Sequence, residues 1–560
     1  MTITEKPWFR KTLLTLAGRP CLKEFLKASK ECKSAQDRIL SKIITTSQGT
    51  AFGKDHKFSS IKNISDYREA VPVNNFEDHR PYVERMCKGE SDILFPGKAI
   101  FYNTTSGTTA KPKVIPVSKD YFENAYSGLS KLWLYSCLLD NPTIYNGKSL
   151  SVVSSDIEGY VEDGTPYGSI SGMVYKNIPN VLKSTYSAPY PVICIKDYLK
   201  KYYALVRFAL AHNITIIIAA SPSSVIRLHQ TIMDEYEDLI KDIYDGTLRC
   251  DVAEQIDPSV RTEVLKTLTP DPKRGKKLEK LMEQHGDQLR PKHFWPNLAL
   301  VNTWKQGNFA HFIPRLDGFF PDSTVIRAFG YQASEGRAGL VMHNSWDYSV
   351  IAGHIYHFEF IELEQRNQKN PDVLQAHEVE VGKRYYILFS NGSGLYRYDI
   401  NDIVEIVGFY NQFPIFKFIQ KGEGVTSLTG EKLSEEQVIK AVVETSKELL
   451  AKVSFYTMFC DEKNFCYKFF VEFKDTIDST TKPSFITALD DKLRQFNPEY
   501  KDKRGTLRLL PPSLYELKEN SYERFKETLI RYGMAREGQY KDVYLTKNQK
   551  VLQFLEKLQK

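Results

Sequence analysis

A loop rich in hydroxyl groups is the strongest candidate for chemistry in this sequence. It runs from Thr104 to Lys113 as TTSGTTAKPK, directly after a run at 99–102 that reads as a β-strand. Its hydroxyl and backbone N–H groups can donate to phosphate oxygens, Gly107 permits close approach of the backbone, and lysine adds a point charge. Segments of Ser, Thr and Gly are more often flexible turns, but this density of hydroxyls around one glycine, followed by Lys-Pro-Lys, is uncommon. We therefore expect the loop to bind a phosphate chain.

Two further runs could complete a nucleotide site. The run FGYQASEGR follows a predicted strand at 325–329, where Tyr331 could stack on a base and Glu335 could hold Mg²⁺ beside phosphates. The run YRYDIND places Asp402 just before a predicted strand at 403–407, where its carboxylate could accept hydrogen bonds from both ribose hydroxyls. Each acid taken alone could equally be an exposed loop residue or a helix cap.

Other motifs for phosphate, hydrolase or metal chemistry are incomplete. The segment GKS at 147–149 would end a Walker-type loop only if residue 142 were glycine, and it is Pro142. No G-x-S-x-G elbow occurs, which weakens a serine-hydrolase interpretation. The pattern HIYH at 354–357 could bind a metal, but it lacks a third ligand nearby, and a strand surface is the favoured interpretation.

The elements that must position these motifs alternate between strands and helices over the first part of the chain. Amphipathic stretches predict helices, such as 198–212 and 223–244. Apolar runs predict strands at 99–102, 150–153, 192–195, 214–219, 298–303 and 325–329. Such alternation predicts an α/β architecture, here with mixed sheets.

Beyond residue 385 the pattern changes to hairpin-like strands joined by Asn, Gly and Pro turns, which predicts a β-rich subdomain. Helices and strands in the order of a compact α+β unit follow it, including a predicted strand at 506–510. The length of the chain also predicts more than one domain. We expect a large N-terminal domain at 1–420, a hinge at 421–424 and a smaller α+β lid domain at 425–560.

The composition is that of an ordinary globular protein, with 42% hydrophobic and 26% charged residues. A net charge of +7 over 560 residues gives no reason to expect a nucleic-acid partner. The eight cysteines lie far apart without a C-x-x-C pair, so a reducing, cytoplasmic setting is expected. The strongly apolar run at 214–220 is far shorter than the ~20 residues that cross a bilayer, and no membrane association is expected. The interrupted apolar patch at the N-terminus is expected to belong to the folded domain and not to a secretory signal.

The three runs occur in the order TTSGTTAKPK, GYQASEG and YRYDIND, and GEKLSEEQV follows them. In this combination the chain resembles the adenylate-forming superfamily. Within it, the chain is most similar to the acyl-acid amido synthetase family, the auxin- and jasmonate-conjugating enzymes of plants and their microbial relatives. EDGTPYGSISG at 162–172 and WPNLALV at 295–301 are also similar, and the resemblance covers roughly residues 40–545.

The resemblance implies an ATP site built from all three runs. The residues that it assigns to the ATP phosphates are Thr105, Ser106, Gly107, Thr108, Thr109 and Lys113. It further implies that Tyr331 packs against adenine, that Ser334 and Glu335 lie near phosphate and Mg²⁺, and that Asp402 binds the ribose.

Two lysines in or near the predicted lid complete this set. Lys421 stands at the hinge position where relatives commonly carry arginine, and it is expected to contact ATP. Lys541, in GQYK, resembles the lid lysine that reaches the acyl-phosphate region. The resemblance therefore implies Lys541 and Glu335 as the catalytic residues, with Glu335 also the Mg²⁺ ligand.

The resemblance implies a reaction in two steps. A small carboxylic acid is activated by ATP and Mg²⁺ as an acyl-adenylate, and an amine, expected to be an amino acid, then takes the acyl group. A first alternative has coenzyme A or another thiol as acceptor. A second is a non-catalytic relative that binds nucleotide or an acyl ligand, motivated by Ala110 where adenylate-forming enzymes usually carry glycine, by Lys421 and by the altered sequence after Lys541. The acid is expected near residues 170–175 and 221–225.

Overall fold

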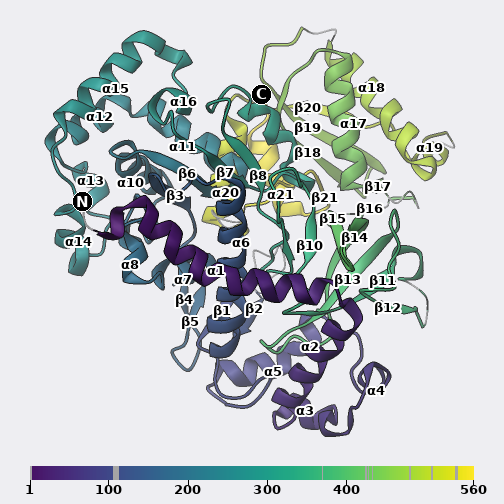
Figure 1. The fold of residues 1–560 in the computed structure, drawn as a ribbon. Coiled ribbons are helices and arrows are strands. Elements are labelled where there is room, and N and C mark those ends of the chain that lie inside the picture. The colour runs from purple at the N-terminus through teal and green to yellow at the C-terminus, as the bar shows by residue number, and fades with distance from the viewer. Residues whose placement is uncertain are drawn as a thin grey trace.

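The structure is a computed structural model. It describes residues 3–104, 113–366, 368, 370–422, 425–426, 428–429, 431, 433–478, 481–505, 509–535 and 540–560. N-terminal helices, drawn purple in Figure 1, run along the front and base of the molecule, and the C-terminal elements lie at the top and behind the centre. No helix among the described residues is both long and apolar enough to span a membrane.

A four-stranded parallel sheet forms the centre of the N-terminal half, with the strand order β3-β6-β7-β8. Its strands are β3 (Lys148–Val152), β6 (Ile214–Ala219), β7 (Leu300–Thr303) and β8 (Val325–Ala328). β6 reads ITIIIA and is almost wholly buried, as expected of a parallel strand covered on both faces. Helix α11 (Pro222–Asp234) contacts β6, and helix α10 (Tyr198–Leu210) packs against α11. Because the strands are parallel, their carboxyl ends meet at one edge of the sheet.

Two sequence predictions in this region are wrong. The run at 192–195 is not a strand, because residues 192–193 end a short helix, α9 (Tyr190–Ile193), and residues 194–195 leave it. Pro191 suits a first helical turn and cannot donate within a sheet. The helix predicted at 223–244 is two helices, α11 and α12 (Tyr236–Asp245), which are separated at Glu235.

A smaller sheet, ordered β2-β1-β5-β4, carries the predicted phosphate loop. Strands β1 (Phe101–Thr104) and β2 (Val114–Val117) are antiparallel, and Thr104 is the register partner of Val114. The two strand ends that flank the predicted loop are therefore adjacent. Helix α6 (Ser127–Asp140) follows β2 and packs along α1 (Pro7–Ser29), where Gly18 leaves room for the side chain of Tyr135.

A seven-stranded sheet confirms the β-rich character expected beyond residue 385. It is ordered β12-β11-β13-β14-β15-β10-β9, and every pairing in it is antiparallel. Its long strands are β13 (Arg384–Ser390), β14 (Tyr398–Tyr410) and β15 (Phe413–Lys421). The pairing of β14 with β15 sets Asp402 directly opposite Lys421.

The C-terminal part has its own hydrophobic core and a four-stranded sheet ordered β20-β19-β18-β21. Its elements include β18 (Val453–Asp461), β19 (Cys466–Phe473), β20 (Ser513–Glu516), β21 (Leu545–Thr546), α17 (Glu435–Glu448), α18 (Thr481–Phe496), α20 (Ser521–Arg531) and α21 (Gln549–Lys557). Residues 506–508 of the strand predicted at 506–510 lie outside the described residues, and 509–510 are not strand.

Helix α17 begins with a capping box. The Ser434 hydroxyl accepts from the Gln437 N–H, while the Gln437 side chain accepts from the Ser434 N–H. Next along the helix, Glu436 forms an ion pair with Arg384 of β13, 3.1 Å away. Lys526 of α20 donates to Ser223 of α11. These contacts join the C-terminal part to strand β13 of the seven-stranded sheet and to helix α11 beside the parallel sheet.

Candidate active site

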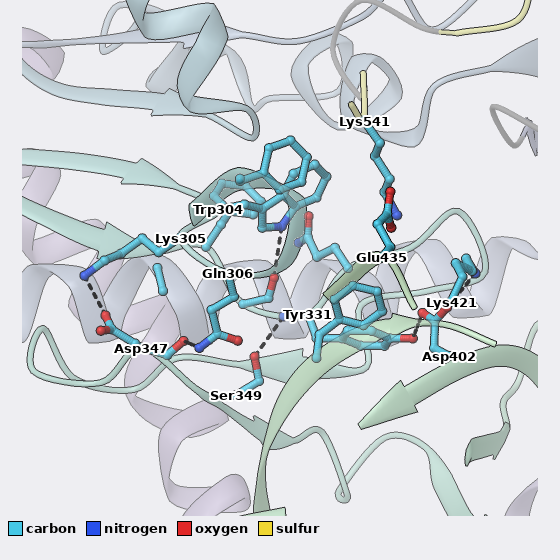
Figure 2. Close-up of a pocket in the computed structure, with 16 residues that line it drawn as sticks. Trp304, Lys305, Gln306, Tyr331, Asp347, Ser349, Asp402, Lys421, Glu435 and Lys541 are labelled. Atoms are coloured by element: carbon cyan, nitrogen blue, oxygen red, sulfur yellow. Dashed lines mark hydrogen bonds and ion pairs between the residues drawn. The ribbon is translucent and has the colours of Figure 1, made fainter. Parts of the chain in front are cut away.

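A cleft lies where the parallel sheet, the seven-stranded sheet and the C-terminal part meet, and it contains about 800 Å³ of space that is partly open to solvent. It lies at the carboxyl ends of β7 and β8, against β14 and β15, and the C-terminal part closes it from the other side (Figure 2). Its lining residues are Trp304, Lys305, Gln306, Phe309, Ala328, Phe329, Gly330, Tyr331, Gln332, Asp347, Ser349, Asp402, Phe418, Lys421, Glu435 and Lys541. The cleft therefore contains the predicted residues Tyr331, Asp402, Lys421 and Lys541.

Asp402 is the centre of a polar cluster at one end of the cleft. Its Oδ2 accepts from the Tyr331 hydroxyl at 2.5 Å, and its Oδ1 lies 2.6 Å from Lys421 Nζ. Lys421 Nζ also donates to the carbonyl of Ile400 at 3.0 Å. Asp402 is buried, and burial together with the Asp402 charge raises the pKa of Tyr331 well above its usual value. A neutral Tyr331 hydroxyl and the Lys421 ammonium therefore hold the carboxylate in one orientation.

Lys541 enters the cleft from the C-terminal part and extends toward this cluster, with Glu435 beside it (Figure 2). Desolvation between the cleft walls lowers the pKa of Lys541, and the Lys421 ammonium lowers it further, while Asp402, Glu335 and Glu435 oppose the shift. The side chain is itself exposed to the open cleft, so water screens these charges. An ammonium in this position can neutralise charge that develops on a phosphate or a carboxylate.

Ser334 and Glu335 lie on a turn beside the cleft and line a second, much smaller cavity with Ile170. The Ser334 hydroxyl donates to the Thr104 carbonyl at 3.0 Å, where β1 meets the predicted phosphate loop. Glu335 is 9% exposed, and its Oε1 accepts from the Tyr398 hydroxyl at 3.3 Å. The structure thus brings the predicted metal ligand to the end of β1, with one carboxylate oxygen already oriented.

The phosphate loop itself can be placed only by its flanks. Thr105, Ser106, Gly107, Thr108, Thr109 and Ala110 lie outside the described residues. Lys113 is described, and its Nζ lies over the ring of Phe76 at 5.9 Å, so it does not line the large cleft. Thr104 Oγ1 lies 3.3 Å from Glu158 Oε2 and 3.3 Å from the Gly168 carbonyl oxygen, either of which can accept its one hydroxyl proton, and these contacts fix the point where the loop begins.

The sequence predictions missed the opposite end of the cleft. Lys305 Nζ lies 2.5 Å from Asp347, and Gln306 donates to the Asp347 carbonyl. The indole of Trp304 donates to the Gly330 carbonyl at 3.2 Å, which ties the two strand ends together (Figure 2). Residues 304–306 directly follow the correctly predicted strand β7. Their position at the carboxyl end of a predicted strand could therefore have identified them as candidate site residues.

The alternative sites gain no support from the described residues. His354 is buried against Phe25, and burial lowers its pKa to about 3. Within the described ranges, no cluster of three or more His, Cys, Asp or Glu residues could hold a metal ion. Ile170 does line the small cavity beside Glu335, whereas Ser223 contacts Lys526 of the C-terminal part.

Comparison with known proteins identifies three consecutive family segments. The GH3 family N-terminal domain matches residues 21–325, the GH3 family central domain matches 349–421, and the GH3 family C-terminal domain matches 436–550. An indole-3-acetic acid-amido synthetase, GH3.2 of Arabidopsis thaliana, is 25% identical over 460 residues, which cover 77% of this chain and 82% of the relative. The 4-substituted benzoates-glutamate ligase GH3.12 of Arabidopsis thaliana is 24% identical, covering 95% of this chain and 96% of the relative.

Solved structures show the same fold. The GH3.15 acyl acid amido synthetase superposes with a TM-score of 0.84 at 21% identity and covers 97% of this chain and 96% of its own. A 2-hydroxyisobutyryl-CoA ligase in the postadenylation state superposes with a TM-score of 0.56 at 10% identity over 95% of this chain and 92% of its own. The predicted adenylate-forming fold is therefore confirmed, and so is the predicted family: the chain belongs to the GH3 family.

Proposed function

We propose that the protein uses ATP to activate a small carboxylic acid as an acyl-adenylate and then transfers the acyl group to an amino acid. The observation that carries this proposal is the Tyr331–Asp402–Lys421 cluster at one end of a cleft that Lys541 enters from the C-terminal part. A buried, oriented carboxylate suits two ribose hydroxyls, and aromatic walls suit a base. The amido synthetases and the benzoates-glutamate ligase among the relatives support the same reaction class.

In the first step, a carboxylate oxygen of the acid attacks the α-phosphorus of ATP, and the bond to the β-phosphate oxygen breaks, releasing pyrophosphate. In the second, the amine nitrogen attacks the acyl carbon and loses a proton, and AMP leaves. We assign Lys541 to charge that develops around the α-phosphate, because its ammonium projects into the cleft. Tyr331 and Trp304 line the cleft where adenine would lie.

Glu335 would hold Mg²⁺ in this assignment. It is a mostly buried carboxylate beside the end of β1, and the Tyr398 hydroxyl is its described side-chain partner, which leaves oxygen lone pairs for a hard cation. When bound, Mg²⁺ neutralises phosphate charge. Thr105, Ser106, Gly107, Thr108, Thr109 and Lys113 remain the proposed phosphate ligands.

The domain boundaries also belong to the proposal. We assign the large domain to 1–420, the hinge to 421–424 and the lid to 425–560, in a cytoplasmic enzyme. Lys421 ends β15 and pairs with Asp402, so a movement about this point would shift the lid and the ribose site together. Glu423 and Gly424 lie outside the described residues.

Two measurements separate this function from its alternatives. Acid-dependent exchange of pyrophosphate with ATP tests activation, and mass spectrometry of the product tests the acceptor. A thioester formed with coenzyme A, in place of an amide formed with an amino acid, would overturn the second step alone. A chain that binds ATP but exchanges no pyrophosphate with any aryl, indole or fatty acid would be a binding protein.

A further inference from the structure

A buried arginine with unused hydrogen-bond donors lies directly beside the candidate active site. Arg337 is 3% exposed and follows the turn that carries Ser334 and Glu335. Its guanidinium carbon lies 4.5 Å from the ring centre of Trp133 and 5.6 Å from that of Phe329. Phe329 also lines the large cleft. The cation therefore packs over two aromatic rings, one of which belongs to the cleft wall.

Hydrogen-bond donors of Arg337 and of the neighbouring Trp133 have no acceptor among the described residues. Arg337 Nε and Nη2 and the indole Nε1 of Trp133 are buried, and none of them has a hydrogen-bond partner in the described part of the chain. Among the described residues, the titratable groups that influence the pKa of Arg337 are Tyr126, Cys137 and Tyr356, and burial raises the pKa of each of these groups, so they are uncharged near neutral pH. Guanidinium and indole groups only donate hydrogen bonds. Arg337 and Trp133 thus hold three buried donors without an acceptor, and Arg337 adds a positive charge that an anion would neutralise.

The geometry of the free donors favours a carboxylate. Nε and Nη2 form one edge of the planar guanidinium, and this edge matches the two oxygens of a carboxylate in a bidentate pair. Burying a charge without a counter-ion is strongly unfavourable, so such a group is retained where it meets a ligand. The rings of Trp133 and Phe329 occupy the face of the cation and leave its edge for hydrogen bonds.

The two ends of the turn at 334–337 contact different parts of the structure. Ser334 donates to Thr104 at the end of β1, beside the phosphate loop. Arg337 instead packs on Trp133 of α6, and its backbone N–H donates to the Tyr356 hydroxyl at 3.0 Å. Between them, Glu335 and Gly336 line the small cavity that also contains Ile170, in the region expected to hold the acid. The turn therefore connects the phosphate-loop side, at Ser334, with α6, at Arg337.

We propose that Arg337 binds a second carboxylate of the acid substrate, so that the protein selects acids that carry an anionic group away from the carboxylate that is adenylated. The inference rests on the proposed function and adds a substrate class to it. Arg337 acts as a specificity-determining residue, and no chemical step passes through it.

Pyrophosphate exchange measures only the activation of the acid, because no amino acid is present in the reaction. The probes are benzoate, terephthalate and monomethyl terephthalate, together with hexanoate and adipate. Monomethyl terephthalate retains the length of terephthalate and removes the second charge. Each diacid is compared with the acid that lacks its second charge: terephthalate with monomethyl terephthalate, and adipate with hexanoate. The quantity compared is the ratio of kcat/KM for the diacid to kcat/KM for the acid paired with it, because this ratio does not depend on how much of a variant is folded.

The proposal predicts that the wild-type protein favours a diacid over its partner by about 10²-fold or more. Arg337→Met should lower the ratio at least tenfold, and Arg337→Lys, which retains the charge without the fork, should lower it less. The matched control is Arg290→Met, because Arg290 also lies over an aromatic ring, Phe319 at 5.7 Å, outside the site. That control should leave the ratio unchanged.

Other outcomes overturn the proposal in distinguishable ways. Exchange with monoacids at a ratio near one, unaffected by Arg337→Met, would exclude a second carboxylate while leaving acid activation in place. An equal loss with both members of each pair would assign Arg337 to the reacting carboxylate. If Arg337→Met leaves the exchange ratio unchanged but raises the KM for the amino acid in amide formation, Arg337 would be assigned to the acceptor. Absence of exchange with every acid would overturn the proposed function as well.

Discussion

Asp402 is the residue on which the proposed nucleotide site depends. Its two oxygens are held by Tyr331 and Lys421, which approach it from different segments of the chain. The family resemblance implies arginine at position 421, where this chain has lysine, and a lysine meets the carboxylate as a point charge with no planar fork. The side chain of Lys421 is 44% exposed, so this ion pair contributes little to stability and mainly orients the carboxylate.

Removing the Asp402 charge should weaken ATP binding. For Asp402→Asn we expect the KM for ATP in pyrophosphate exchange to rise about 10- to 100-fold, because hydrogen bonds to a charged group contribute about 1.5–3 kcal/mol. The matched control, Asp322→Asn, changes an exposed turn carboxylate and should leave this KM unchanged. An unaltered KM in Asp402→Asn would show that the ribose lies elsewhere.

Lys541 tests whether a residue of the C-terminal part serves adenylation. Lys541→Ala should lower the rate of pyrophosphate exchange by about 10²- to 10³-fold, because an oriented charge at the developing transition state is lost. Its effect on amide formation from a supplied acyl-adenylate should be smaller. Lys547→Ala removes an exposed lysine of the same segment and serves as control. Equal losses in both half-reactions would contradict a role specific to adenylation.

At the scale of elements, helix α17 connects the site to the C-terminal part. Its first turn places Glu435 in the cleft and Glu436 against Arg384 of β13. The capping box at Ser434 fixes where this turn begins. The capping box therefore sets the position of Glu435 and Glu436.

Loss of the cap should destabilise the C-terminal part without altering its fold. Ser434→Ala should lower the free energy of unfolding by about 1 kcal/mol, measured by urea denaturation. Thr487→Ala removes an exposed hydroxyl in the middle of α18, bonded to the Pro483 carbonyl, and should be neutral or slightly stabilising. If both variants lose the same free energy, the capping box has no special role.

Elements with strong local signals were predicted correctly from the sequence. The apolar run of β6 and the hairpin strands beyond residue 385 lie where the periodicity indicates. The run at 192–195 was predicted wrongly as a strand. Its valine and isoleucines suit a strand, whereas Pro191 suits the first turn of a helix, and local propensity alone does not decide between strand and helix. The break at Glu235 likewise depends on packing, since the pattern remains helical across it.

Some residues of the candidate site were predicted from the sequence, and others were not. Tyr331 and Asp402 stand in recognisable runs, so their types and neighbours sufficed. Asp347 and Trp304 have no such run, and they join the cleft because β7 and β8 end beside each other. Arg337 carries no local sign that its guanidinium lacks a partner, since that depends on which side chains the fold brings around it.

At the scale of the whole molecule, Asp542 lies buried where the last segment of the chain meets the N-terminal half. Burial raises the pKa of Asp542 to about 7, while Lys526 and Arg315 oppose the shift. The folded state therefore holds this proton more tightly than the unfolded state, whose pKa is near 3.8. The contribution to stability is complete below about pH 4 and is lost as pH rises through 7.

Asp542→Asn should remove this dependence. We expect the wild-type free energy of unfolding to fall by up to about 4 kcal/mol between pH 4 and pH 8 through this group, and the variant to be correspondingly flatter. Urea denaturation at both pH values measures the difference. Asp475→Asn, an exposed carboxylate in the C-terminal part, should follow the wild-type curve. Parallel curves for wild type and Asp542→Asn would contradict the raised pKa.

The central claim is that one cleft, built from the N-terminal half and closed by the C-terminal part, activates an acid and delivers it to an amine. Its most direct test is pyrophosphate exchange with ATP over a panel of aryl, indole and fatty acids, followed by mass spectrometry of the products with each amino acid. The account predicts exchange that requires an acid, is abolished in Glu335→Gln with the fold intact, and leads to an amide and AMP only when an amino acid is added. Acid-independent exchange, full activity in Glu335→Gln, or silence across the whole panel despite measurable ATP binding would contradict it.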